Sequence, residues 1–320
     1  MSRSIGLLRF RWWHEAFLIA LLAALLVIAG SLMPNFLNGS SQLLHSRQLW
    51  EFAILAIGMT MIILTGGIDL SVGSTMGLCA VAFGLVFRGS GSVAWSALAC
   101  LATGTACGAA NGALIAWIRM SPLIVTLATF AAFRGIAEGI SQGASYSRFG
   151  NAFADVARGT WCGVPLPGWI FVGLLIAGVI FLNRTPTGRY VYALGHNEQA
   201  ARFSGVPVDA VKFWLYTLSG LLSSIASLVY VSRFDTATAD AGKGFELDVI
   251  TAVVIGGTSI YGGRGNLFGT TLGLLLIHET RLFVSRYWRV DELRSIVIGS
   301  LLIGSVLMYR LFVRSDRHES

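Results

Sequence analysis

Two polar residues, Asp69 and Ser71, interrupt a long apolar region and are the first candidates for a chemical role. They lie in the segment TGGIDLSVGS, 65–74, whose glycines permit backbone that is not helical. Non-helical backbone within a membrane is tolerated only where it is buried in protein or lines a cavity. We therefore expect this segment to line or gate a translocation path. An ordinary turn, in which Asp69 caps the following helix through the backbone N–H of residue 71 or 72, is a compatible alternative.

Three further polar residues lie inside apolar stretches. Arg134 and Glu138 are four residues apart and therefore share one face of a predicted helix. Asn111 lies in the Gly- and Ala-rich stretch 101–113, where it can hydrogen-bond a neighbouring helix or a solute hydroxyl. Because polar groups within a bilayer are costly and often mark a transport path, all three are candidates for that path. The simpler interpretations are an ion pair that only lowers the cost of insertion and an amide that only joins two helices.

The composition places these residues in an integral membrane protein. Of the 320 residues, 55% are hydrophobic and 12% are charged, whereas soluble domains average about 25% charged residues. The mean hydropathy of +0.71 leaves little polar surface to face water. The net charge is +7, but the basic residues lie mostly between apolar runs and at the two ends, as expected near lipid headgroups. We therefore expect contact with membrane lipid and no nucleic-acid binding.

Apolar stretches of about 17 to 25 residues predict membrane-spanning helices. Ten candidate stretches lie near residues 14–33, 51–66, 71–88, 92–117, 121–141, 168–183, 212–232, 247–261, 266–283 and 294–312. The stretches 51–66 and 247–261 are short, and each is followed by a Gly-rich break, so discontinuous or re-entrant helices would reduce the count to eight. The prediction is an all-α membrane protein with one domain over residues 1–320.

Basic residues cluster at both ends of the chain. The clusters are Arg3, Arg9 and Arg11 before the first stretch, and Arg310, Arg314 and Arg317 after the last. Positively charged flanks favour the cytoplasmic side of a bacterial inner membrane. An even number of spans puts both termini on the same side, so we expect both in the cytoplasm.

The longest polar segment on the expected cytoplasmic side is the loop at about 183–212. A short helical pattern begins in it near Asn197, which is a suitable N-cap, and Gly205 and Pro207 end the pattern. A short amphipathic helix on a membrane loop can lie on the bilayer surface or insert into the groove of a partner protein. This loop is therefore the main candidate for a partner contact.

The helix in this loop resembles the EAA motif of ABC importer permeases. The matching residues are Glu198, Ala200 and Ala201, followed at the expected spacing by Gly205. In that family the motif forms a coupling helix that docks into a cleft on the ATPase subunit. The resemblance implies that the small alanines let the helix seat deeply, that Glu198 offers a charge to the cleft, and that Gly205 ends the helix.

Longer segments carry the same resemblance. Four of them, in order, are similar to permeases of the ribose, xylose and arabinose type, within the superfamily of branched-chain amino acid and monosaccharide permeases: TGGIDLSVGS at 65–74, SPLIVTLATFAAFRG at 121–135, TPTGRYVYALGHNEQAARFSGV at 185–206 and GKGFELDVITAVVIGGTSIYGGRGNLFGT at 242–270. The similarity covers about residues 30 to 280. After residue 277 the stretch HETRLFVSRYWRVDELR departs from the commonest form and is closer to the rhamnose or autoinducer-2 branch.

The resemblance implies a transmembrane domain like that of type II ABC importers, working by alternating access. The implied partners are a cytoplasmic ATPase subunit, a periplasmic solute-binding protein and a second permease copy, in a homodimer or a heterodimer. The implied solute is a monosaccharide of the ribose or rhamnose kind, or autoinducer 2. An importer of nucleosides or branched-chain amino acids is the alternative within the superfamily. An ion-coupled secondary transporter, which would need no ATPase, is the alternative of another class.

The sequence lacks the residues that an ATPase or another enzyme would need. No G-x-x-x-x-G-K-[ST] motif is present, and the two Gly-rich segments lack the lysine that binds β- and γ-phosphates. We therefore expect ATP and Mg²⁺ to be used by the partner ATPase and no cofactor to be bound by this chain. No set of a nucleophile, a base and an orienting group appears, and no metal-ligand spacing, so we expect no catalytic residues and no metal site.

Overall fold

Helices make up nearly all of the structure, a computed structural model that describes residues 2–288, 293, 296–297, 299–301 and 303–304, with side chains from residue 14 onward. The long helices are α1 (Ser2–Leu32), α3 (Trp50–Leu64), α4 (Val72–Ser90), α5 (Val93–Ala116), α6 (Pro122–Ser141), α8 (Leu166–Arg184), α11 (Val208–Phe234) and α13 (Leu267–Tyr287). The short helices are α2 (Gly39–Ser46), α7 (Asn151–Arg158), α9 (Pro186–His196), α10 (Glu198–Phe203) and α12 (Phe245–Ile255). Two small antiparallel pairs complete the fold, β1 (Tyr146–Ser147) with β4 (Thr236–Ala237) and β2 (Thr160–Trp161) with β3 (Val164–Pro165).

Among the described residues, 7 helices are long and apolar enough to cross a membrane, and 8 segments qualify if the bent pair α2 and α3, at 57°, forms one broken span. These match eight of the ten predicted stretches. At 247–261 the alternative of a short, discontinuous helix agrees with the structure and the full crossing does not, because α12 has only 11 residues there. At 1.5 Å per residue, such a helix reaches about half of the roughly 30 Å hydrocarbon core. The stretch 294–312 lies largely outside the described residues.

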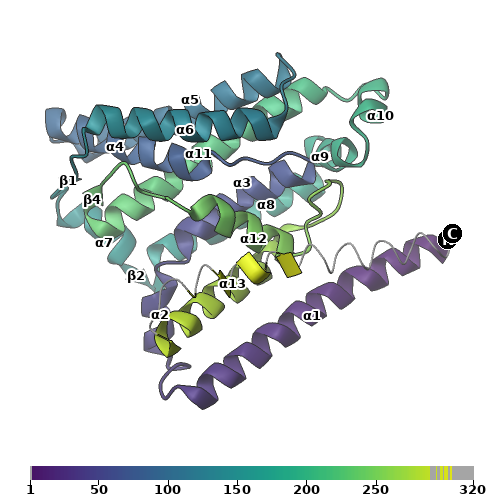
Figure 1. Cartoon of the computed structure of the whole chain (residues 1–320), viewed down its shortest axis with the longest axis horizontal. Coiled ribbons are helices and arrows are strands. Elements are labelled where there is room, and N and C mark those ends of the chain that lie inside the picture. The colour runs from purple at the N-terminus through teal and green to yellow at the C-terminus, as the bar shows by residue number, and fades with distance from the viewer. Residues whose placement is uncertain (1, 289–292, 294–295, 298, 302, 305–320) are drawn as a thin grey trace.

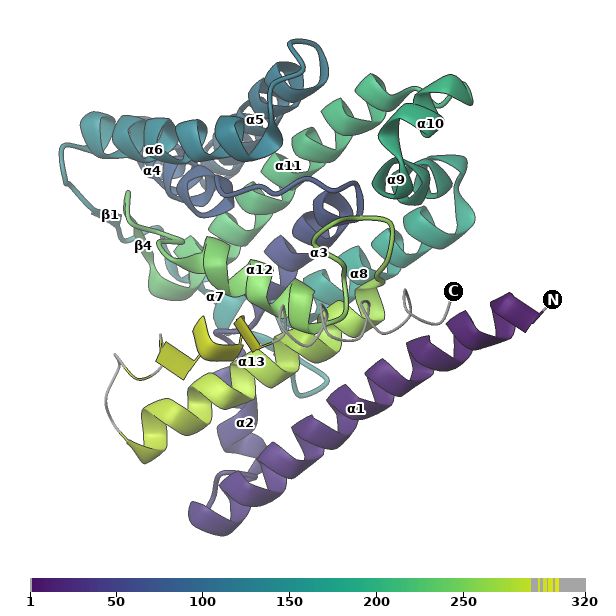
Figure 2. The same ribbon diagram turned by 45° about the vertical axis from the view of Figure 1, so that its right-hand side comes forward.

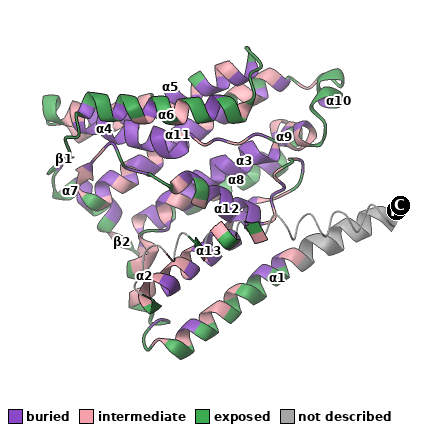
Figure 3. Ribbon diagram, viewed as in Figure 1, coloured by how far each residue is buried: buried purple, intermediate pink, exposed green. Residues whose placement is uncertain are grey.

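The helices form a bundle with two distinct ends (Figures 1 and 2). Helices α9 and α10 lie at one end, together with the connection between α5 and α6 and the turn at 256–266. The opposite end holds α2, α7 and the strands. Burial is concentrated in α3, α4, α11 and α12, whereas α6 and the described part of α1 expose much of their surfaces (Figure 3). The exposed apolar faces are available to lipid or to other subunits.

The contact between α5 and α11 depends on glycines that bring the two backbones together. A Cβ atom on Gly220 would lie 2.1 Å from the carbonyl oxygen of Gly104, and one on Gly108 would lie 2.3 Å from that of Tyr216. Close approach of this kind supplies the dispersion contacts that hold helices together in lipid. The small residues of 101–113 therefore build the centre of the bundle.

Substituting Gly220 by valine is expected to destabilise the protein by about 1–3 kcal/mol, because the added methyl groups must push α5 and α11 apart. The free energy of unfolding would be measured by titration with a denaturing detergent in mixed micelles. Gly135→Val in α6 is the matched control, since a Cβ there meets nothing within 4 Å. Equal stability losses in the two variants would contradict the role of the α5–α11 contact.

Candidate coupling helix and translocation path

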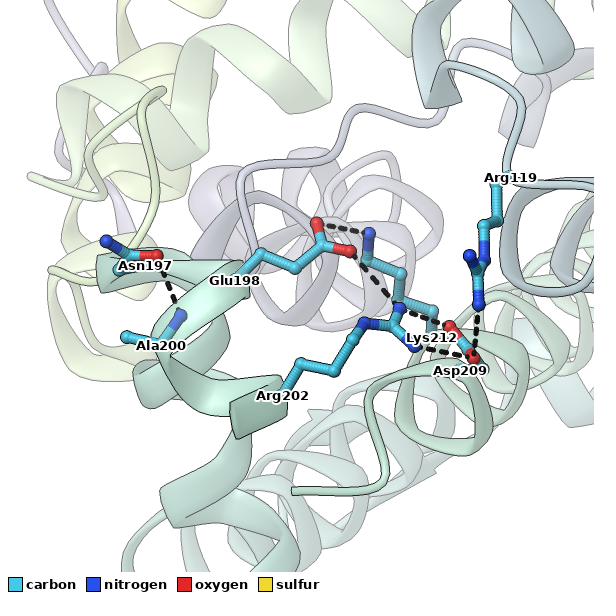
Figure 4. A network of polar contacts seen from close by, with 7 residues as sticks. All are labelled: Arg119, Asn197, Glu198, Ala200, Arg202, Asp209 and Lys212. Atoms are coloured by element: carbon cyan, nitrogen blue, oxygen red, sulfur yellow. Dashed lines mark hydrogen bonds and ion pairs between the residues drawn. The ribbon is translucent and has the colours of Figure 1, made fainter. Parts of the chain in front are cut away.

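Helix α10 is a single short helix with a defined start and end (Figure 4). The side-chain oxygen of Asn197 accepts a hydrogen bond of 2.9 Å from the backbone N–H of Ala200, as the N-cap prediction requires. At the other end, Gly205 has a φ of +81° and its N–H donates to the carbonyl of Arg202 at 3.1 Å. Glycine adopts this left-handed conformation without the steric cost that other residues carry. The sequence motif therefore has the helical geometry that was predicted for it.

Charged side chains join α10 to the first turns of α11 (Figure 4). Glu198 binds the Lys212 ammonium at 2.6 Å. The guanidinium of Arg202 donates two hydrogen bonds to Asp209, at 2.6 and 2.9 Å, and Arg119 approaches the same carboxylate at 3.9 Å. The hydrogen bonds to Asp209 raise the pKa of the Arg202 guanidinium above its usual value. Glu198 is therefore engaged within the chain and not simply a free charge offered to a partner.

The outer surface of α10 is apolar at one position that the EAA-like motif does not include. Phe203, the last residue of the helix, is 92% exposed, whereas Ala201 is only 5% exposed and packs against the bundle. Ala200 is exposed on the outer side. Exposed aromatic residues are enriched among the energetically dominant residues of protein interfaces. In the sequence, Phe203 could have been noticed as the one aromatic residue in a short helix of otherwise polar and alanine residues.

Helix α9 connects α10 to the rest of the bundle through backbone contacts. The N–H of Gly263 donates to the carbonyl of Leu64, at the end of α3, with a length of 2.8 Å. Gly195 lies against both atoms, because a Cβ there would be 1.9 Å from the Leu64 oxygen and 2.2 Å from the Gly263 nitrogen. The Tyr192 hydroxyl donates to the carbonyl of Gly265 at 3.1 Å. The α9–α10 unit is therefore seated on the end of α3 and on the turn between α12 and α13.

Three of the five predicted path residues form one buried contact. The carboxylate of Asp69 accepts hydrogen bonds from the backbone N–H of Ser71 at 2.9 Å and from the hydroxyls of Ser71 and Ser219 at 2.6 and 3.0 Å. The amide of Asn111 donates to the Ser71 hydroxyl at 2.8 Å. Asp69, Ser71 and Asn111 are each at most 3% exposed. The turn alternative predicted the hydrogen bond from the N–H of Ser71, although Ser71 and not Asp69 is the N-cap of α4. The contact joins the 65–71 break to α5 and α11, while a role in the path stays a prediction.

The other two predicted path residues lie on α6 and do not pair. None of the described ion pairs joins Arg134 to Glu138, which is exposed. Arg134 instead donates to the carbonyls of Ala239, Ala241 and Gly73. The expected ion pair is therefore not formed at contact distance among the described residues, because the guanidinium finds closer oxygen acceptors on the backbone of two other segments, and the Glu138 carboxylate acts on it only from a longer range. Among the described residues, no group of three or more His, Cys, Asp and Glu side chains could hold a metal ion.

Comparison with known proteins gives a consistent assignment. Residues 46–306 match the family described as the permease component of branched-chain amino acid transport systems. The chain is 35% identical over 306 residues to the autoinducer 2 import system permease protein LsrD of Escherichia coli K12, covering 94% of this chain and 93% of the relative. It is 36% identical over 305 residues to LsrD of Photorhabdus laumondii, covering 93% and 91%. No solved structure matches the chain significantly.

The match extends over nearly the whole length of both chains and includes the 183–212 loop, the 65–74 break and the α12–α13 turn. The chain therefore belongs to the branched-chain amino acid transport system permease family, and it is a multi-pass membrane protein that forms the permease subunit of an ABC importer.

Proposed function

We propose that this permease imports a small polyhydroxylated, sugar-like solute such as autoinducer 2, and that α10 docks a cytoplasmic ATPase. The likeness to autoinducer 2 permeases over 94% of the chain supports the solute class. The few charged side chains inside the spans agree, because a neutral hydroxylated solute needs hydrogen bonds more than counter-ions. The observation that carries the docking surface is the exposed Phe203 on a short helix that ion pairs hold in place.

The proposed function determines how the chain is oriented in the membrane and which subunits it works with. The end of the bundle with α10 faces the cytoplasm of the bacterial inner membrane, and α1 begins at that same end (Figure 2). The chain works with a periplasmic solute-binding protein outside and with a second permease copy, identical or related. ATP and Mg²⁺ bind to the ATPase, whose closure moves α10 and changes the side to which the solute cavity opens.

Shortening Phe203 to alanine is expected to reduce ATP-dependent uptake by at least about tenfold, because truncating an aromatic that dominates an interface costs about 2 kcal/mol or more. Gly205→Pro should have a similar effect, since proline cannot adopt a φ of +81° and lacks the N–H that donates to Arg202. The measurement is autoinducer 2 uptake into proteoliposomes that hold the permease, the ATPase and the binding protein. Glu198→Lys, which replaces the Lys212 pair by a repulsion, should also lose uptake.

Phe268→Ala provides the matched control, because Phe268 is also exposed, at 55%, but lies on α13. Full uptake by all three variants at 198–205 would contradict the coupling role. Uptake of leucine or a nucleoside in place of autoinducer 2 would instead move the solute assignment to the other branches of the superfamily. Uptake that follows a proton gradient without the ATPase would contradict the whole proposal.

A further inference from the structure

Two broken segments meet inside the bundle, each at the start of a helix. The non-helical stretch 65–71 leads into α4, and the stretch 235–244, apart from its short strand, leads into α12. Their first turns touch, since a Cβ on Gly73 would lie 2.4 Å from the Gly242 carbonyl oxygen and 2.4 Å from Oε2 of Glu246. Broken helices whose N-termini converge within a membrane are typical of solute sites in transporters, because their free N–H groups and positive ends favour oxygen ligands.

One side chain on a third helix holds both breaks in place. Arg134 of α6 donates through Nη1 to the carbonyls of Ala239 and Ala241, the latter at 3.3 Å, and through Nη2 to that of Gly73 at 3.2 Å. The guanidinium therefore links the 235–244 stretch to the start of α4 by hydrogen bonds. Any opening of this region must break or exchange these bonds.

Glu246 has an unused hydrogen-bonding atom at this junction. The residue is only 9% exposed, and Oε2 has no hydrogen-bond partner among the described residues. A buried carboxylate oxygen without a donor is costly, typically by 1 kcal/mol or more. The adjacent residues Lys243, Gly244 and Leu247 are exposed, so the junction lies just beneath the surface of the bundle, on the side that also carries α6.

We propose that Glu246 is a solute-binding residue, which accepts a hydrogen bond from a hydroxyl of the transported solute when the 235–244 stretch moves aside. This inference rests on the proposed function, because it takes the solute to be polyhydroxylated. A carboxylate is a strong acceptor for a hydroxyl, and such bonds are roughly twice as strong as neutral ones. Arg134 acts as a positioning residue that holds the site closed between transport cycles. The second permease copy would cover the exposed side of the junction.

The test is Glu246→Gln, which keeps the size of the side chain and removes the charged acceptor. With autoinducer 2 as the probe, we expect the amount of solute transported per ATP hydrolysed to fall by at least about tenfold. ATP hydrolysis stimulated by the loaded binding protein should stay within about twofold of the wild-type rate. Glu246→Asp, which retains a carboxylate, should recover part of the transport.

Asp155→Asn serves as the control, because it makes the same chemical change on an exposed side chain of α7. Unchanged transport per ATP in Glu246→Gln would overturn the proposal. A parallel loss of ATP hydrolysis and transport would also overturn it and assign Glu246 a purely structural role. If the wild-type complex itself fails to take up autoinducer 2, the fault lies in the proposed function, which the wild type reveals without any variant.

Discussion

Gly195→Ala is expected to abolish most ATP-coupled uptake and to destabilise the protein by about 3 kcal/mol, at the upper end of the range for overpacking. The added methyl carbon would sit 1.9 Å from the Leu64 carbonyl oxygen and 2.2 Å from the Gly263 nitrogen. Both are backbone atoms, and the Gly263 N–H donates a hydrogen bond to the Leu64 oxygen at 2.8 Å. Neither atom can therefore move out of the way as the end of a flexible side chain could. The α9–α10 unit must then lift from its seat on α3 and the α12–α13 turn.

The measurement pairs uptake into proteoliposomes with unfolding in mixed micelles. Gly139→Ala is the matched control, because a Cβ at this α6 position meets nothing within 4 Å. Alanine is favoured over glycine inside a helix by roughly 0.5–1 kcal/mol, so the control should be neutral or slightly stabilised. Since Gly195 also lies in a helix, the opposite result at that site can only come from its contacts. Normal uptake and stability in Gly195→Ala would contradict the close packing described.

Arg233→Leu should be the most destabilising substitution of a charged residue described here, at about 3–5 kcal/mol. The Arg233 guanidinium donates to Glu51 at 2.8 Å, and the Glu51 side chain is fully buried. The same guanidinium lies 4.1 Å from the ring centre of Phe234. Removing it leaves an uncompensated carboxylate in the interior, where water cannot replace the lost partner.

The double replacement Glu51→Met with Arg233→Leu separates the charge effect from the packing effect. Exchange of a whole buried ion pair for apolar residues is often neutral or stabilising, so the double variant should recover most of the lost stability. Arg88→Leu, at an exposed position near the end of α4, should change the free energy of unfolding by no more than about 0.5 kcal/mol. A double variant as unstable as Arg233→Leu alone would show that the arginine acts through packing instead.

Local features of this fold followed from local sequence patterns. Apolar length identified the spans that the structure describes, because the bilayer imposes a minimum on every crossing helix. The cap at Asn197 and the end at Gly205 were also predictable, since both depend on residues within a few positions of each other. For α12 the sequence left a full crossing and a short discontinuous helix both open, because the apolar run continues into the turn that follows it and hydropathy does not distinguish the two.

The features that required the structure are contacts between distant segments. Arg134 lies 105 residues from Ala239 along the chain, so the sequence suggested the nearest carboxylate, Glu138, as its partner. Glu246 could not be singled out from the sequence, because only the folded chain brings its carboxylate to Gly73. The exposure of Phe203 likewise depends on which face of α10 the ion pairs turn toward the bundle.

Helix α11 has a mechanical consequence for the whole transporter. Its 27 residues form a continuous rod of about 40 Å. Ion pairs join one end of this rod to α10. At the other end, the Ser232 hydroxyl donates a hydrogen bond to the Phe153 carbonyl at 2.5 Å and accepts one from the N–H of Ala157 at 3.0 Å, and both of these residues lie in α7. If α10 docks the ATPase as proposed above, a displacement of α10 is transmitted along this rod to α7. By thermodynamic reciprocity, a ligand that shifts α7 would then bias the ATP-dependent position of α10 by the same free energy.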